Sequence, residues 1–349
     1  MPFQQQSSPS SEYALLESIK PYLGYKKSSR FPIPIGDDAA IRVCNDHEQL
    51  ALTADSFVQD VHFSLRYMTH EEIGYKAMAI NLSDCAAMGA AADAALVQII
   101  FPQTLPPSKV TAAIKNIYKG FSTACDHWKF PIIGGNVSAG PCWIIDITLL
   151  GRASKDHRLL LRKGAHDNDG LWVTGFPGMS AAGLGVLQSH ALRKQIPFKV
   201  KKYVDAHIHP IPRIEIGLAL SNDDSVHCAM DISDGISKDA RTMAHENNMG
   251  IILMADSEII RNSLMHAAKY LHKDWQELFF HGGEEYELLF GASANFDPRP
   301  FVKKFGVPIT KIGNFARIPK GVFVEDSNGL RTKLKKGGWD HMHNDILKA

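Results

Sequence analysis

The sequence has 349 residues, of which 45% are hydrophobic and 21% are charged, and its formal net charge is +1. That length fits two domains of ordinary size, and the composition is typical of a soluble globular protein. The near-neutral charge argues against nucleic acid or an acidic membrane surface as a partner. No apolar run approaches the roughly 20 residues that a membrane-spanning helix needs.

The cysteines favour a cytoplasmic protein with reduced thiols. The five are scattered, odd in number and include no C-x-x-C pair, which is not the pattern of a disulfide framework or a zinc site. Residues 1–12 are polar and lack the basic start and apolar middle of a signal peptide. We expect them to form a disordered lead-in.

Helices and strands alternate along the first half of the chain. The expected helices are 13–23, 71–89 and 108–125, and the expected strands are 50–58, 94–101 and 143–151. The second of these helices begins with an acidic turn and stops at Gly89. We take 13–153 as a first domain.

The same alternation continues in a second domain, 154–349. The expected strands are 170–175, 226–230, 250–254 and 309–315, and the expected helices include 236–247 and 259–271. The basic stretch 199–212 contains His207-x-His209, a pair that can bind a metal. Because prolines follow it, we interpret this stretch as a surface loop.

Aspartates recur beside Gly, Ala and Ser where strands, turns and helices meet. They are Asp37, Asp38, Asp55, Asp84, Asp231 and Asp234. The last two stand where an apolar strand ends and a helix begins, so they either cap the helix or hold a metal and a phosphate. The adjacent pair Asp37-Asp38 fits either a surface turn or a cation site, because neighbouring carboxylates repel each other.

The other two aspartates occur within apolar elements. Asp55 lies in the middle of an expected strand, where a bare carboxylate marks either a site or an exposed bulge. Asp84 shares a helix face with Asn81, and both need partners if that helix is buried. Carboxylates on both domains indicate a shared set of hard oxygen ligands for Mg²⁺, which binds through carboxylates and substrate phosphates.

These features predict a metal-dependent enzyme that acts on a nucleotide or a phosphoester, since phosphoryl transfer needs mainly alignment and charge neutralisation. The chain contains no P-loop motif, and Gly183-x-Gly185 is too short for a dinucleotide fingerprint. Gly134-Gly135-Asn136 either lets a phosphate approach the backbone or forms a tight turn. After Gly282-Gly283, Glu284 is a candidate site residue. His62 is either structural or a ligand.

The ordered motifs resemble those of the thiamine-monophosphate kinase family, whose superfamily includes aminoimidazole ribonucleotide synthetase and selenophosphate synthetase. They cover nearly the whole chain after the lead-in. The motifs are G-D-D-A-A at Gly36, V-x-x-V-H-F at Val58, G-Y-K-A-M-A-I-N-L-S-D-C-A-A-M-G at Gly74, G-G-N-V-S at Gly134, D-I-S-D-G at Asp231, G-G-E-E-Y-E-L at Gly282 and G-W-D-H at Gly338.

The resemblance implies transfer of a phosphoryl group from ATP, the co-substrate, to thiamine monophosphate. It implies direct in-line transfer with several Mg²⁺ ions, no covalent intermediate and no catalytic side chain. The implied metal ligands are Asp38, Thr53, Asp55, Asp84, Asn136, Asp231 and Asp234; the implied ATP contacts are Gly135, Asn136, Arg162 and Ser233; the implied substrate contacts are His62, Glu284 and Trp339.

The resemblance also implies an α/β (α+β) fold and a cytoplasmic homodimer. The domain 13–153 would bind ATP and metal, and its sheet would pair with that of a second copy into a β-barrel. The domain 154–349 would be an α/β domain on the outside. From its charge and the absence of a long apolar run, we expect no nucleic acid or membrane to take part.

Three positions depart from the family pattern. The family has G-G-D where this chain has Asn136, a hydroxyl residue where it has Ala54, and G-G-E-D-Y where it has Glu285. The first two fall on the expected metal site, where losing one negative charge weakens Mg²⁺ binding. Two alternatives therefore stay open: a catalytically weakened nucleotide-binding paralogue, and a superfamily relative that acts on another small phosphate acceptor.

Overall fold

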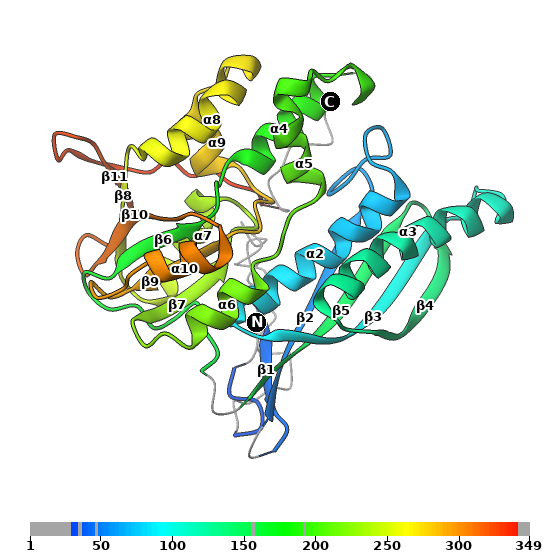
Figure 1. Ribbon diagram of the computed structural model, residues 1–349, viewed down its shortest axis with the longest axis horizontal. Coiled ribbons are helices and arrows are strands. Elements are labelled where there is room, and N and C mark those ends of the chain that lie inside the picture. The colour runs from blue at the N-terminus through cyan, green and yellow to red at the C-terminus, as the bar shows by residue number, and fades with distance from the viewer. Residues whose placement is uncertain (1–28, 34–36, 46–47, 155–157, 191–192, 341–349) are drawn as a thin grey trace, which may run out of the picture.

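Two open β-sheets lie on either side of helix α2 (His70–Met88) in the computed structural model, one sheet from each half of the chain (Figure 1). The structure describes residues 29–33, 37–45, 48–154, 158–190 and 193–340. The expected lead-in 1–12 and the expected helix 13–23 lie outside the described residues. The two-sheet α/β fold confirms the predicted fold class at this level.

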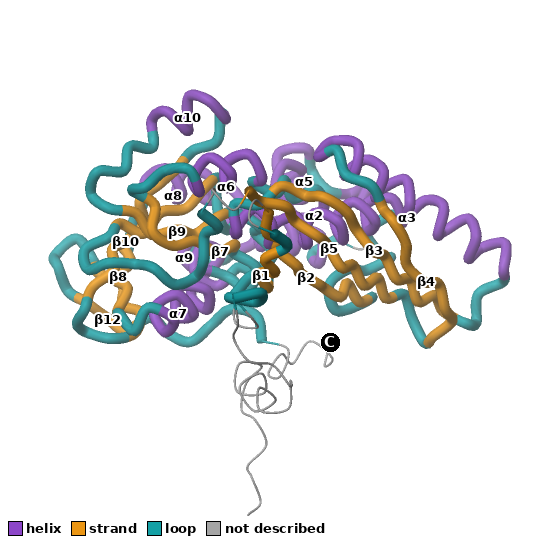
Figure 2. Tube along the Cα trace, turned by 90° about the horizontal axis from the view of Figure 1, so that it is seen from below, coloured by secondary structure: helices purple, strands orange, loops and turns teal. Residues whose placement is uncertain are grey.

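The first sheet contains five strands in the order β1-β2-β5-β3-β4. Their bounds are β1 Ala40–Val43, β2 Glu48–Val58, β5 Ile144–Ser154, β3 Ala91–Pro102 and β4 Ile132–Gly140. All neighbours pair antiparallel except β3 and β4. Helices α2 and α3 (Pro107–Trp128) lie on one face of this sheet (Figure 2). Ala95, Val97 and Ile99 of β3 are buried, while Leu96 between them is 39% exposed.

The second sheet contains seven strands in the order β12-β11-β8-β10-β6-β9-β7. Their bounds are β6 Gly170–Thr174, β7 Val226–Asp231, β8 Gly250–Met254, β9 Leu288–Ala292, β10 Ile309–Ala316, β11 Gly321–Glu325 and β12 Arg331–Lys333. The helices of this half are α4 Met179–Gln188, α5 Lys201–Ile208, α6 Ile214–Ser221, α7 Ile236–Glu246, α8 Glu258–Leu271, α9 Trp275–His281 and α10 Arg299–Phe305. Helix α7 packs against β8 and β11, and α4 packs against α5 and α8.

Helix α2 is buried along most of its length because other elements contact it on several sides: α3, α6, β2, β5 and β7. Thr69 and Glu72 form a capping box at its start, and Gly89 ends it in the left-handed conformation. Both ends agree with the sequence prediction. A helix that is apolar all round is expected to be buried.

Two segments differ from the sequence expectations. The double glycine at Gly134-Gly135 does not form a turn, because β4 runs through it. A Cβ on Gly135 would lie 1.8 Å from the carbonyl oxygen of Val97, so glycine permits the close approach of β4 to β3. The stretch 199–212 is not a surface loop, since it contains α5 and the buried side chain of His207.

None of the described helices is both long and apolar enough to cross a membrane.

The contact between α2 and α3 predicts that Gly74→Ala destabilises the protein. An added Cβ would lie 2.0 Å from the carbonyl oxygen of Ile117, so the helices would have to separate at a cost of about 1–3 kcal/mol. Chemical denaturation and Tm report this change. In Gly185→Ala, the control, the nearest atom is the flexible end of Leu271, 3.0 Å away. A Gly74→Ala protein as stable as the wild type would contradict the prediction.

Candidate active site

Three of the predicted metal ligands converge between the two halves of the chain. Asp38 precedes β1, Asp84 lies on α2 and Asp231 ends β7. One carboxylate oxygen from each lies within 4.8 Å of those of the other two. We call these three residues the acidic cluster. The fold thus brings together three carboxylates that are far apart in the sequence.

The acidic cluster has too much negative charge for its surroundings. Burial raises the pKa of Asp231 to about 8, and Asp38 adds to this shift. Burial also raises the pKa of Asp84 well above its usual value, reinforced by Asp55, Asp231 and Asp38. Such shifts mean that the charged forms lack sufficient compensation from the protein alone. A bound cation would supply it.

Two hydroxyl groups orient the cluster. The Thr53 hydroxyl donates to Asp84 Oδ2, and the Ser83 hydroxyl donates to Asp231 Oδ2 over 2.7 Å. Thr53 lies on β2, two residues before Asp55, so the two side chains project to the same face of the sheet. Thr53 contacts Asp84 directly, and Asp55, which is exposed, is close enough to raise the pKa of Asp84.

Arg162 is a cation that contacts the cluster directly. Its Nε donates to Asp38 Oδ1 over 2.8 Å, and its backbone N–H donates to Asp37 Oδ1 over 3.2 Å. Burial raises the pKa of Asp37 to about 7, with Asp38 adding to the shift. Asp38 Oδ2 is buried and accepts no hydrogen bond from the described residues. This orphaned oxygen fits a metal ion, so the donor set suits Mg²⁺.

Asp234 lies beside Asp239, a buried carboxylate that was not predicted from the sequence. Asp234 Oδ2 lies 2.7 Å from Lys238 Nζ. Asp239 on α7 is buried, and burial raises its pKa well above the usual range, with Asp234 and Asp231 contributing. A sequence signal was available, because Asp239 follows Ile236 by three residues and precedes Met243 by four, on the apolar face of its helix.

Two of the three predicted substrate contacts lie against the turn at 231–235. The backbone N–H of Glu284 donates to the Ser233 carbonyl oxygen over 2.7 Å, with Glu284 in the left-handed conformation at φ 59°. The backbone N–H of Trp339 donates to the Asp234 carbonyl oxygen over 3.0 Å. His62 lies in the turn after β2, where its Nδ1 accepts from the Val58 N–H over 3.0 Å and its ring stacks on Phe57 with the centroids 5.9 Å apart.

Lys76 connects α2 to Glu284, and the sequence analysis did not identify it. It is fully buried, and its Nζ lies 3.3 Å from Glu284 Oε1 and 3.3 Å from His207 Nε2. Burial lowers the pKa of Lys76, whereas Glu284 opposes that shift. The signal was a single lysine within an apolar helix, which requires a charged partner. His207 is thus a core residue that hydrogen-bonds within the protein.

Gly135 and Asn136 are not beside the acidic cluster of their own chain. Both lie on the edge strand β4, and β3 and β5 separate that strand from β2. Asn136 pairs with Gln98, which pairs with Asp146, which pairs with Ser56. Three interstrand spacings amount to about 14 Å, too far for Asn136 and Asp55 of one chain to share an ion.

The departure at Glu285 does not affect the acidic cluster. Its carboxylate accepts from the backbone N–H groups of Ser180 and Ala181, each over 3.0 Å, at the start of α4. Glu285 therefore caps a helix, which is a structural task. Burial raises its pKa to about 8.

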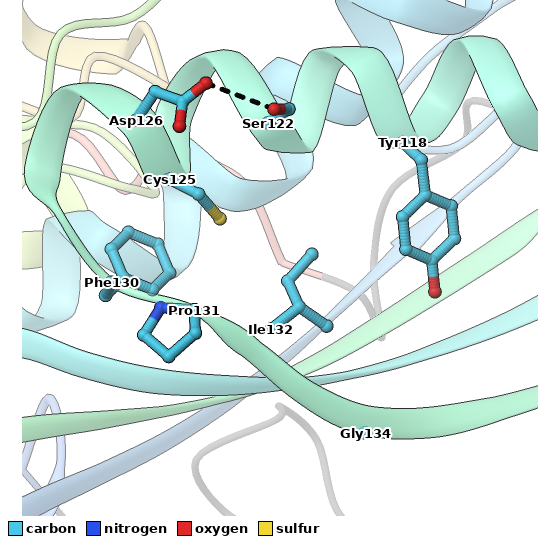
Figure 3. A pocket seen from close by; sticks show the side chains of 8 residues that line it. All are labelled: Tyr118, Ser122, Cys125, Asp126, Phe130, Pro131, Ile132 and Gly134. Carbon is cyan, nitrogen blue, oxygen red and sulfur yellow. Dashed lines mark hydrogen bonds between the residues drawn. The ribbon is translucent and has the colours of Figure 1, made fainter.

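A hollow of about 580 Å³ lies elsewhere, between α3 and β4 (Figure 3). Its lining consists of Tyr118, Ser122, Cys125, Asp126, Phe130, Pro131, Ile132 and Gly134. None of these is a predicted site residue. The Ser122 hydroxyl donates to Asp126 over 3.2 Å at its rim. The hollow lacks converging charged groups, so we do not assign the chemistry to it.

Known proteins resemble this chain over nearly its whole length. The family model for "AIR synthase related protein, N-terminal domain" matches residues 36–153, which defines the class of the first half. Thiamine-monophosphate kinases of Bacillus subtilis and Rhodopirellula baltica are 30% and 32% identical to the chain, and the alignments cover 95% and 94% of this chain and 99% and 98% of the relatives. The chain therefore belongs to the thiamine-monophosphate kinase family.

A solved structure, "AaThiL complexed with AMPPCP and TMP", has the same fold with a TM-score of 0.81. It is 28% identical, and the match covers 97% of this chain and 100% of that one. The predicted family is thus confirmed, and the chain is an enzyme of the phosphotransferase class.

Glu285 generates a testable pH dependence. Its pKa is about 8 in the folded protein and 4.5 in its usual state. Its contribution to stability is therefore fully present below about pH 4.5 and is lost as the pH rises through about 8. The unfolding free energy of the wild type should therefore fall between about pH 5 and about pH 9. In Glu285→Gln this fall should be smaller by up to a few kcal/mol, since one unit of pKa is worth about 1.4 kcal/mol.

Unfolding at several pH values measures this effect, with Glu277→Gln on the exposed side of α9 as the control. If Glu285→Gln kept the wild-type pH dependence, the assignment of this titration to Glu285 would be wrong.

Proposed function

We propose that this chain transfers the γ-phosphoryl group of ATP to thiamine monophosphate, giving thiamine diphosphate and ADP. The observation that carries the proposal is the acidic cluster, which both halves of the chain build beside the turn at 231–235. Similarity to thiamine-monophosphate kinases over about 95% of the chain supports the choice of substrate. The solved relative described with AMPPCP and TMP supports both ligands.

In this proposal several Mg²⁺ ions bind among the acidic residues. The ligands are Asp38, Thr53, Asp55, Asp84, Asp231 and Asp234, and the unsatisfied Asp38 Oδ2 supports this assignment. The ions would neutralise the charge on the transferring phosphoryl group. Arg162 and Ser233 contact ATP.

The substrate contacts are Glu284, Trp339 and His62. Lys76 and the carbonyl oxygen of Ser233 hold Glu284 in position. The Trp339 ring offers an aromatic face to the thiamine rings. The transfer is direct and in line, so no side chain forms a covalent intermediate. Alignment and electrostatic stabilisation then supply the catalysis.

We further propose a cytoplasmic homodimer whose first sheets pair into a β-barrel. The boundary between an ATP- and metal-binding domain, 13–153, and an α/β domain, 154–349, is part of this proposal. Edge strand β4 is exposed along nearly its whole length, including Ile133 at 61% and Val137 at 49%. An apolar edge strand of this kind favours a partner. The five free thiols support the cytoplasm.

In the proposed dimer, Gly135 and Asn136 of one copy would lie at the site of the other copy. Because strand order separates them from the cluster of their own chain, we propose that they complete the metal and ATP site of the second copy. Asn136 can contribute a carbonyl oxygen but no charge.

The second candidate is a weakened nucleotide-binding paralogue, which Asn136 and the exposed Ala54 favour. Its metal site would have lower affinity for Mg²⁺ than one with a further carboxylate. This candidate predicts that the wild type binds ATP without turnover. It would be supported if the double variant Asn136→Asp with Ala54→Thr gained turnover. A relative that acts on another small phosphate acceptor would make ADP with that acceptor alone.

Purified protein with ATP, Mg²⁺ and thiamine monophosphate should form ADP and thiamine diphosphate in equal amounts. Asp84→Asn should lower kcat/KM by at least about 10²–10³-fold, since it removes charge from the centre of the cluster. Asp126→Asn, an exposed change on α3, is the matched control. The kinase proposal fails if ATP binds and no thiamine diphosphate forms.

Mixing two inactive chains tests whether the site is shared between copies. Asp84→Asn chains and Asn136→Lys chains are refolded together in equal amounts. If Asn136 completes the partner's site, each mixed dimer has one intact site out of two. Because half of the dimers are mixed, the sample should recover about a quarter of the wild-type activity. Each variant alone is the control. Recovery near zero would place both residues in one chain's site.

A further inference from the structure

A second group of metal-binding side chains lies outside the acidic cluster, at one end of the second sheet. It consists of His166, Asp169 and His227, which we call the His-Asp-His cluster. His227 Nδ1 lies 2.7 Å from Asp169 Oδ2 and 2.9 Å from His166 Nδ1. His166 Nδ1 lies 3.9 Å from the same carboxylate oxygen. Three ligand atoms therefore point at one another.

The β-sheet positions two members of this cluster. Asp169 immediately precedes β6, and His227 is on β7, while β9 pairs with both strands. Gly170 and Val226 both pair with Ala292, and Cys228 pairs with Gly291. His227 therefore has no counterpart on β9 and forms a bulge. Bulges redirect a side chain from the regular alternation.

The backbone around the third member is also held in place. The side-chain oxygen of Asn247 accepts from the N–H groups of Gly164 and Ala165, over 2.7 and 2.8 Å. The backbone N–H of His166 donates to Asp169 Oδ2 over 2.6 Å. The side chain of Asp169 is only 4% exposed, whereas that of His166 is 70% exposed. The ligands are thus ordered, and one side opens to water.

Without a cation, two of these contacts compete for the single ring atom Nδ1 of His227. The Nδ1 atom of His227 carries either one proton or one lone pair in its ring plane. If it donates to Asp169, the same proton has to be shared with the lone pair of His166 Nδ1, 2.9 Å away. If it accepts from His166, its lone pair faces the carboxylate at 2.7 Å. A cation among the three atoms would make all three contacts favourable.

The separations also fit a transition metal. Bonds of about 2.0–2.1 Å in a tetrahedral site place ligand atoms about 3.3 Å apart, and the observed separations of 2.7, 2.9 and 3.9 Å fall on both sides of that value. Two imidazoles and one carboxylate prefer Zn²⁺ and similar ions to Mg²⁺.

We propose that His166, Asp169 and His227 bind one Zn²⁺ ion, with water at the open fourth position. The ion joins the segment before β6 to the bulge of β7. Because Phe315 of β10 also donates its N–H to the Asp169 carbonyl oxygen over 2.8 Å, the ion would stabilise three strands of the second sheet. This proposal is independent of the proposed substrate.

The test uses the full chain without an affinity tag, freed of metal and then saturated with Mg²⁺ so that the acidic cluster is occupied. Calorimetry with Zn²⁺ should give one strong site, and Co²⁺ should give the visible absorption of a low-symmetry site. Zn²⁺ should also raise Tm, because it binds only the folded chain. His166→Ala should weaken binding at least about tenfold and remove the Tm shift, since it deletes a ligand.

Two further variants keep the test decisive. Asp169→Asn should behave like His166→Ala, and the exposed change His245→Ala on α7 should bind Zn²⁺ as the wild type does. His166→Ala affects an exposed side chain, so the variant should fold normally. Equal Zn²⁺ affinity in the wild type and His166→Ala would overturn the proposal, as would the absence of a site in the wild type.

Discussion

Electrostatic repulsion among Asp38, Asp84 and Asp231 is the constraint that the rest of the site depends on. The fold holds these carboxylates within 4.8 Å of one another, and burial makes their charged forms unfavourable without a cation. Packing energy from the two halves opposes that repulsion. Arg162 offsets part of it at Asp38, while among the described residues Asp84 and Asp231 accept hydrogen bonds from hydroxyl groups. The stability of the fold and the proposed metal binding therefore depend on the same three side chains.

Much of the fold and of the acidic cluster could be predicted from the sequence because their signals are local or strongly patterned. The bounds of α2 follow from an acidic first turn and Gly89. The aspartates at 38, 84 and 231 stand out because carboxylates are rare in apolar surroundings. Their convergence could be proposed because a shared cation explains their number.

Other parts depend on tertiary contacts that have no local signature. The role of Lys76 could not be predicted, because it depends on the burial of α2 and on the nearby Glu284, which is distant in sequence. Helix α5 was not predicted, because the prolines that follow it favoured a loop over 199–212. Asn136 was expected beside Asp55, but strand order places β3 and β5 between their strands. His227 owes its direction to a bulge, which is a property of pairing with β9.

Helix α2 sets the distance between two parts of the site. Lys76, which holds Glu284, and Asp84, which belongs to the acidic cluster, are both on this one buried helix. Eight residues of α-helix correspond to a rise of about 12 Å. The helix therefore fixes the distance between the Lys76–Glu284 pair and the acidic cluster. An insertion or deletion between them would change this distance and also rotate one end against the other.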